Sequence, residues 1–105
     1  MWAIHSGVAE KMTTARFVAI AKALSDPMRL KVLEAIRGGE DVTCTCVCER
    51  VSLSQPTISH HVRALERAGV ISIRKDGQFN RLSIRQDVLD EFAEAVTPRK
   101  RRRAP

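Results

Sequence analysis

Apolar residues recur at helical spacing along most of the chain, and turn-forming residues separate the repeats. The first repeat places Phe17, Ile20 and Leu24 at positions i, i+3 and i+7, which is the spacing of one helix face. Thr13 or Thr14 is the candidate N-cap, because a threonine hydroxyl can accept a hydrogen bond from a backbone N–H at a helix start. The pattern predicts a first helix that ends at the sequence Ser-Asp-Pro.

A second helix is predicted to begin within Ser-Asp-Pro. Asp26 is a candidate N-cap, and Pro27 suits the first helical position, where no intrahelical N–H is needed. Two consecutive glycines at 38–39 predict its end. Its apolar face is expected to carry Leu30, Leu33 and Ile36.

Two further helices are predicted around a tight turn. A short helix is expected from about Cys46 to Val51, and Ser54 is the candidate N-cap of a longer one over residues 55–68. Gly69 predicts the end of the longer helix.

The remainder of the pattern predicts a hairpin and a last helix. Residues 70–74 and 79–84 are short β-branched or alternating runs, and Lys-Asp-Gly-Gln joins them with Asp-Gly at the turn. A last helix is expected over residues 86–96, with Val88, Leu89, Phe92 and Val96 on one side. Helix, helix, short helix, tight turn, helix, hairpin and helix is the order of a winged helix-turn-helix, a mainly α fold with a β-hairpin wing.

Length and pattern predict one domain. The chain has 105 residues, and the winged helix-turn-helix and dimerisation domain is expected over residues 13–96. Residues 1–12 are treated as an N-terminal extension to which the pattern assigns no role. Residues 97–105 are expected to form a basic, disordered tail.

Charge is unevenly distributed and indicates a polyanionic partner. The formal net charge is +6, and the tail at 99–103 holds five of the 18 basic residues. Residues 50–85 contain seven basic and two acidic residues, a net +5, whereas residues 86–96 contain four acidic residues and no basic one. The middle of the chain is therefore predicted to carry a polyanion-binding face, and the basic hairpin within it favours double-stranded DNA as the polyanion.

The predicted fourth helix has the two faces of a recognition helix. Ile58, Val62 and Leu65 fall within a narrow arc and are expected in the core, so the opposite polar arc faces outward. Such a helix enters the major groove with its N-terminal residues, while basic wing residues reach the flanking backbone. The expected DNA contacts are Ser54, Gln55, Thr57, Ser59, His60 and Arg63 from the helix and Arg74, Lys75 and Arg81 from the hairpin.

All three cysteines, Cys44, Cys46 and Cys48, lie at alternate positions within five residues. Three neighbouring thiols do not make a disulfide framework, so a reducing cytoplasm is the expected location. We expect neither a signal peptide nor a membrane span. Thiolates select soft ions, and three thiolates suit trigonal As(III) or Sb(III) better than tetrahedral Zn(II).

Regular backbone does not bring these three sulfurs together. Residues turn by about 100° each on an α-helix, so Cys46 would point away from Cys44 and Cys48. On a strand the outer two cysteines would lie about 13 Å apart. A bound ion is therefore expected to impose an irregular turn just before the recognition helix, which would provide a switch.

The chain resembles a known family over about residues 13–96, on the basis of three segments. These are "ALSDPMRLKVLEAI", "LSQPTISHHVRALERAGVI" and "RKDGQFNRLSI". Together they resemble the ArsR family of metal-responsive bacterial repressors. The resemblance implies a homodimer that binds a dyad-symmetric operator and joins through its first and last helices. The expected interface residues are Phe17, Ile20, Leu24, Leu89, Phe92 and Val96.

The resemblance also implies an inducer site at the cysteines. Arsenic sensors of the family carry Cys-x-Cys and a third cysteine three positions on, whereas Cys48 follows Cys46 by two. Cys44 and Cys46 keep the family spacing and are expected to matter most for operator release. The family's other common site needs histidines on the last helix, which has carboxylates but no histidine, so no zinc site is expected there.

Two alternatives remain beside As(III) or Sb(III) induction. The same DNA-binding dimer could respond to Cd(II), Pb(II) or Hg(II), or to thiol oxidation. The acidic residues Glu40, Asp41 and Glu49 disfavour low thiol pKa values and so weigh against a redox sensor. A small thiol enzyme is less favoured, because there is no Cys-x-x-Cys motif and no base placed beside the thiols. No organic cofactor is expected.

Overall fold

The computed structural model describes residues 12–39 and 41–98. Its elements follow the predicted order, with one short strand added, and the winged helix-turn-helix prediction is confirmed. They are α1 (Thr14–Ala23), α2 (Pro27–Arg37), β1 (Val42–Thr43), α3 (Cys44–Val51), α4 (Gln55–Arg67), β2 (Ile71–Asp76), β3 (Phe79–Ile84) and α5 (Gln86–Val96). The interpretations placed on residues 1–11 and on the basic run at 99–103 lie outside the described residues.

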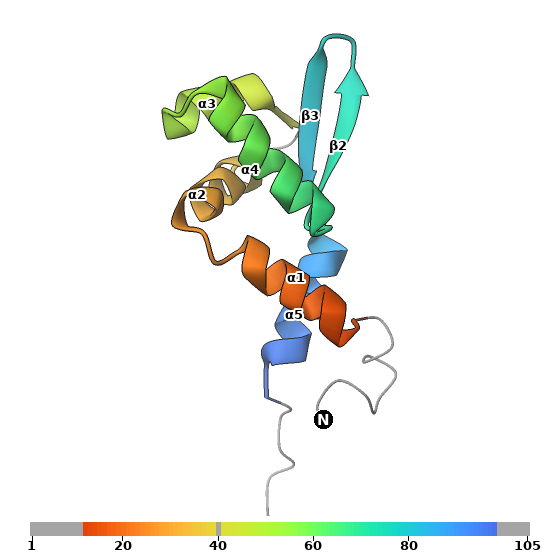
Figure 1. Cartoon of the computed structure of the whole chain (residues 1–105). Helices are drawn as coiled ribbons and strands as arrows, with labels where there is room; N and C mark the ends of the chain where they lie inside the picture. Colours follow the sequence, from red (N-terminus) through yellow and green to blue (C-terminus); the bar gives the residue numbers. More distant parts are fainter. Residues whose placement is uncertain (1–11, 40, 99–105) are drawn as a thin grey trace, which may run out of the picture.

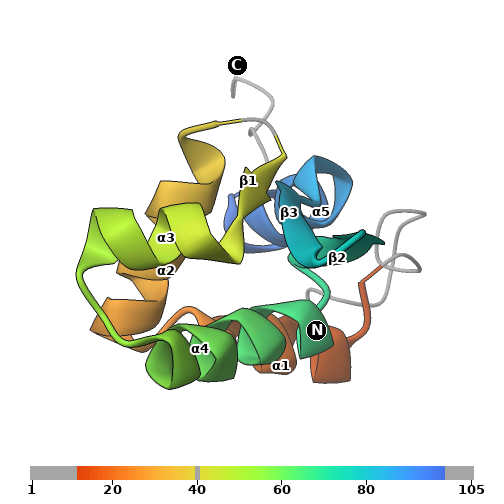
Figure 2. The same cartoon turned by 90° about the horizontal axis from the view of Figure 1, so that it is seen from above.

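The two ends of the molecule have different elements. The wing, β2 and β3, projects from the end that also carries α3 and α4, whereas α1 and α5 lie together at the other end (Figure 1). The sheet is antiparallel with strand order β1-β3-β2. Viewed from above, β1 runs beside β3 and leads directly into α3 (Figure 2). Strand β1, which leads into the helix that contains the three cysteines, is therefore part of the wing sheet.

The hairpin prediction is confirmed, with the turn one residue later than expected. Asp76 pairs with Phe79, so Gly77 and Gln78 form the loop. Gly77 has a φ of 64°, a left-handed value that residues with a Cβ atom rarely adopt.

Capping side chains fix the starts of the first four helices. The Thr13 side chain accepts a hydrogen bond from the Arg16 N–H at 3.1 Å, and Asp26 accepts one from the Met28 N–H at 2.9 Å. Ser54 caps α4 in the same way. Each cap satisfies a backbone donor that has no partner within its helix.

Helix α3 begins two residues earlier than predicted, at Cys44. The reason is Thr43, whose Oγ1 accepts a hydrogen bond from the Cys46 N–H at 3.2 Å and so caps the helix. All three cysteines consequently lie in one helix.

The core joins the inner faces of the helices to the base of the sheet. Val32 and Ile36 of α2 are fully buried, whereas Leu30 is 41% exposed. The expectation that Leu30 belongs to the apolar inner face is wrong. Leu30 precedes Val32 by two residues, which turns its side chain by about 200° away from the buried side of α2.

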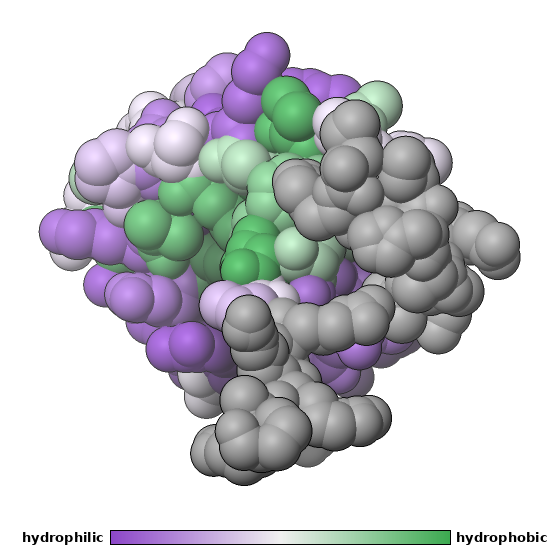
Figure 3. Space-filling view, turned by 90° about the horizontal axis from the view of Figure 1, so that it is seen from below, coloured by the Kyte–Doolittle hydropathy of each residue, from purple (hydrophilic) through white to green (hydrophobic). Residues whose placement is uncertain are grey.

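Helices α1 and α5 pack together and leave apolar surface exposed. Phe17 and Phe92 stack with ring centroids 4.7 Å apart. Val18 and Val96 are 42% and 53% exposed, and hydrophobic surface gathers at this end of the molecule (Figure 3). Ile20, expected in the dimer interface, is 0% exposed and packs inside the chain, so it cannot contribute to an outer surface. None of the described helices is long and apolar enough to cross a membrane.

Candidate thiol site and nucleic-acid interface

Helix α3 divides its cysteines between two faces. Cys44 and Cys48 are separated by one helical turn and share a face, whereas Cys46 is turned by about 200° from Cys44. All three side chains are partly buried, and none is in a disulfide. Among residues 12–39 and 41–98, no three histidine, cysteine or acidic side chains are grouped to hold a metal ion. A three-thiolate site therefore requires a change in the backbone of α3.

The Cys44 and Cys48 face is directed toward the recognition helix. Burial raises the pKa of the Cys44 thiol, and the neighbouring Cys48 raises it further, while the Arg63 guanidinium lowers it. The Cys48 Sγ lies 3.9 Å from Oε1 of Gln55, the first residue of α4, and donates a weak hydrogen bond to it. The Cys48 thiol thus contacts Gln55, which was predicted to contact DNA, and Cys44 lies within electrostatic range of a second such residue, Arg63.

Cys46 lies on the other face of α3, beside the wing sheet. Hydrogen bonds from Thr43 lower the pKa of its thiol, although the charge of Glu49 acts in the opposite direction. The expectation that acidic neighbours keep the thiol pKa values high is therefore wrong for Cys46. The pKa of Arg81 on β3 is raised chiefly by its hydrogen bond to Asp76, with a smaller contribution from the Cys46 charge, so Cys46 is also close to the wing.

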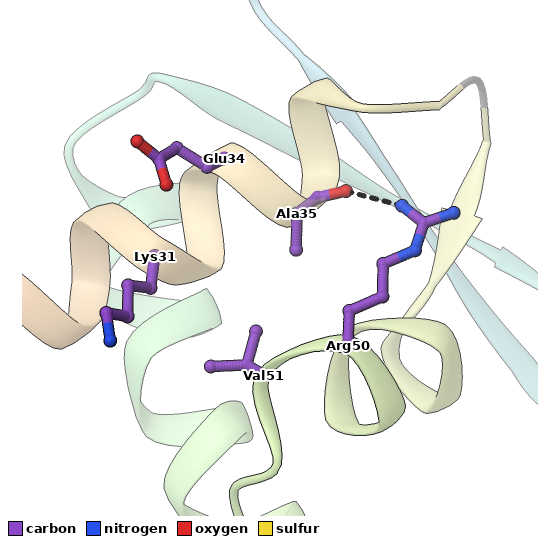
Figure 4. Close-up of a pocket in the computed structure, with 5 residues that line it drawn as sticks. All are labelled: Lys31, Glu34, Ala35, Arg50 and Val51. Atoms are coloured by element: carbon purple, nitrogen blue, oxygen red, sulfur yellow. Dashed lines mark hydrogen bonds between the residues drawn. The ribbon is translucent and has the colours of Figure 1, made fainter.

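Arg50 ties the end of α3 to the end of α2. Its Nη1 donates a 2.8 Å hydrogen bond to the Ala35 carbonyl in the last turns of α2, where the helix dipole favours a cation. The two residues line an open pocket together with Lys31, Glu34 and Val51, and Arg50 reaches across it (Figure 4). The Arg50 charge therefore serves the packing of α3 on α2.

The inward face of α4 is as predicted. Ile58 and Leu65 are fully buried, and Val62 is 2% exposed. His61 is also buried, and its Nδ1 accepts a hydrogen bond from Arg29 Nε at 3.4 Å. Burial lowers the pKa of His61, which indicates a neutral imidazole that packs at the edge of the core.

The outward face of α4 presents most of the predicted DNA contacts to solvent. Gln55, Thr57, His60 and Arg63 are exposed, and Ser59 is half-buried. The Ser54 hydroxyl lies 2.9 Å from the Thr57 hydroxyl and caps α4. Ser54 therefore stabilises the start of the helix.

The wing arginines have partners that the sequence did not reveal. Arg81 Nε donates to Asp76 Oδ2 at 2.8 Å, and its Nη1 donates to the Asp41 carbonyl at 3.3 Å. Arg74 Nη2 forms a 3.3 Å ion pair with Asp41 Oδ1. Lys75 is exposed. Arg81 is thus held by contacts within the protein, and Arg74 shares Asp41 with it.

A winged helix-turn-helix with an exposed polar recognition helix and a basic wing is the fold of a DNA-binding regulator. The Helix-turn-helix domain family matches residues 24–74. The chain is 42% identical over 72 residues to the transcriptional repressor SdpR of Bacillus subtilis, covering 69% of this chain and 79% of SdpR.

Two further comparisons specify the family. The arsenical resistance operon repressor of Staphylococcus xylosus is 38% identical over 72 residues, covering 68% of this chain and 67% of that protein. The homodimeric winged helix-turn-helix DNA-binding domain of a possible ArsR-family regulator from Mycobacterium bovis superposes with a TM-score of 0.67 at 25% identity, covering 76% and 74% of the two chains. The chain belongs to the ArsR family of winged helix-turn-helix transcriptional regulators. The three similar proteins named above are regulators and not enzymes.

Proposed function

We propose that this protein is a homodimeric transcriptional repressor that releases its operator when As(III) or Sb(III) binds the cysteines of α3. The observation that carries the proposal is the contact between the thiol helix and the recognition helix. Cys48 bonds to Gln55, and Cys44 is close enough to Arg63 for the guanidinium to lower its pKa. An ion bound to these thiols would therefore act directly on the residues proposed to contact DNA.

Cys44 and Cys48 are proposed as the first ligands. Residues at i and i+4 have Cβ atoms about 5–6 Å apart, so two sulfurs can approach one ion while the helix remains folded. Cys46 would join only after the first turn of α3 unwinds, because it lies on the other face. This ligand order revises the expectation that Cys44 and Cys46 matter most.

The proposed DNA surface consists of α4 and the outer wing. Gln55, Thr57, His60 and Arg63 would enter the major groove, where their side chains can hydrogen-bond base edges. Arg74 and Lys75 would reach phosphates flanking the site. Arg81, held by Asp76 and Asp41, is assigned a positioning role in the wing instead.

The proposed dimer surface lies at the α1 and α5 end, away from the wing. It retains Phe17, Leu24, Leu89, Phe92 and Val96, adds the exposed Val18, and omits the buried Ile20. Such an arrangement gives two recognition helices related by a twofold axis, which suits an operator with dyad symmetry.

Release would follow from competition for the start of α4. Coordination removes the Cys48 thiol from Gln55, and recruitment of Cys46 unwinds the first turn of α3, the helix that precedes the recognition helix. Coupling between two sites is typically about 1–3 kcal/mol, which corresponds to a loss of operator affinity of about 5- to 150-fold.

Fluorescence anisotropy of labelled operator, titrated with arsenite, tests the proposal. The Cys44→Ser and Cys48→Ser proteins should bind DNA normally but respond poorly to arsenite. Cys46→Ser should still bind arsenite, with less release of DNA. If the protein with all three cysteines changed to serine still releases DNA on addition of arsenite, these cysteines are not the sensor.

Hg(II) is the second candidate inducer, because the Cys44 and Cys48 pair offers two thiolates to a soft, two-coordinate ion without unwinding α3. The same titration with Hg(II) separates the candidates. An Hg(II) response that does not depend on Cys46, with no response to arsenite, would favour mercury.

A further inference from the structure

Asp41 joins the segment before the cysteine helix to both wing arginines. Its carboxylate Oδ1 lies 3.3 Å from Arg74 Nη2, and its carbonyl accepts a hydrogen bond from Arg81 Nη1 at 3.3 Å. Arg74 and Arg81 are directly opposite each other on β2 and β3. Asp41, which lies outside the hairpin, therefore contacts both arginines of this cross-strand pair.

The backbone holds Asp41 in this position. Asp41 has a φ of 52°, in the left-handed region, which aspartate and asparagine tolerate better than most residues with a Cβ atom. The next two residues, Val42 and Thr43, pair with Leu82 and Arg81 of β3. The sheet thus fixes the backbone of Asp41 beside the wing.

We propose that Asp41 acts as an internal substitute for a DNA phosphate and limits the affinity of the wing for DNA. The Arg74 guanidinium is bound to a carboxylate oxygen in the free protein, and a phosphate oxygen must compete with that carboxylate when DNA binds. This inference rests on the proposed function, since it requires that the wing contact DNA. Asp41 is a positioning residue that acts through Arg74.

The expected size of the effect follows from exposure. The side chains of Arg74 and Asp41 are 61% and 52% exposed, so solvent screens their ion pair. Exposed pairs of this kind change an equilibrium by no more than about fivefold. Freeing one arginine for one phosphate should also change the slope of log affinity against log salt concentration. We expect this slope to become more negative by about 0.9 for each wing that contacts the duplex.

The test is Asp41→Asn, which removes the charge and keeps a residue that tolerates positive φ. Binding to a labelled, mixed-sequence duplex is measured by anisotropy over a range of salt concentrations, because phosphate contacts do not depend on sequence. Asp41→Asn should bind about two- to fivefold more tightly per wing at low salt, with a steeper salt dependence. Glu34→Gln is the matched control, since it makes the same change of charge at an exposed position on α2, which is not part of the wing.

Arg74→Ala, alone and combined with Asp41→Asn, gives a double-mutant cycle. If Asp41 acts through Arg74, most of the gain from Asp41→Asn should vanish in the Arg74→Ala background. An undiminished gain in that background, or an Asp41→Asn protein with wild-type affinity and salt dependence, overturns the inference. Should Asp41→Asn fail to fold, Asp41→Gly carries the same test, because glycine also adopts positive φ. A wild-type protein that binds no duplex would instead refute the proposed function.

Discussion

Thr43 offers a direct measure of whether inducer binding unwinds α3. Its hydroxyl caps the turn that holds Cys44 and Cys46, with Oγ1 3.2 Å from the Cys46 N–H, and it lowers the pKa of the Cys46 thiol. The cap stabilises the ligand-free helix. If three-thiolate coordination unwinds that turn, the cap is lost in the bound form.

Thr43→Ala should therefore tighten arsenite binding. Loss of a threonine N-cap typically costs about 1 kcal/mol. The substitution destabilises only the free form, so arsenite affinity should rise by that amount, or about fivefold. Isothermal titration calorimetry measures the affinity, and the arsenite concentration for half-release of operator should fall by the same factor.

Two variants serve as controls for Thr43→Ala. Thr43→Ser keeps the hydroxyl and should resemble wild type. Thr13→Ala removes the equivalent cap of α1, where Oγ1 lies 3.1 Å from the Arg16 N–H, and should lower stability similarly without changing arsenite affinity. If Thr43→Ala loses stability but binds arsenite no more tightly than Thr43→Ser, the first turn of α3 stays folded in the complex, and the proposed switch is wrong.

Four other predictions address the fold, the thiols, the dimer and the DNA surface. Gly69 has a φ of 86° at the end of α4, so Gly69→Ala should reduce the free energy of unfolding by about 1–2 kcal/mol, and an unchanged thermal denaturation curve would contradict this. Cys46 should react with iodoacetamide faster than Cys44 near neutral pH, because its lowered pKa gives more thiolate, whereas burial raises the pKa of Cys44; peptide mass spectrometry measures both rates, and equal rates would count against the assignment. Val18→Glu should yield monomers in analytical ultracentrifugation, while Leu30→Glu, at a similarly exposed position on α2, should stay dimeric; a dimeric Val18→Glu protein would place the interface elsewhere. Arg63→Ala should weaken operator binding by about 1–3 kcal/mol and relax specificity, whereas Lys75→Ala should mainly reduce the salt dependence; operator binding by Arg63→Ala at wild-type strength would remove α4 from the proposed surface.

Local patterns were sufficient to predict most of the fold. The Ile58, Val62 and Leu65 arc identified the inward face of α4, because three apolar residues at helical spacing can be buried together on only one side. Caps such as Asp26 marked helix starts, since a short polar side chain there satisfies backbone donors. These signals lie within a few residues of the feature that they predict.

The errors came from features without a local signal. Strand β1 has two residues, Val42 and Thr43, which is too short to show any alternation, so the cap at Thr43 and the earlier start of α3 were missed. Leu30 and Val32 lie on different apolar faces of α2, and the sequence does not show which face is buried. In the structure the face with Val32 packs in the core. The contacts of Asp41 were hidden because its partners lie 33 and 40 positions away in the sequence.

The division of the cysteines between two faces of α3 has a consequence for the kind of response. Cys44 and Cys48 face α4, whereas Cys46 faces Thr43 and the wing strand. An ion held by the pair alone would disturb the recognition helix and leave β1 paired with β3. An ion that also recruits Cys46 must break the Thr43 cap and unwind the first turn of α3. The number of thiolates that an ion takes should therefore decide whether α3 stays folded beside the recognition helix or loses its first turn. For this reason trivalent arsenic is expected to reduce operator affinity more than an ion that binds two thiolates.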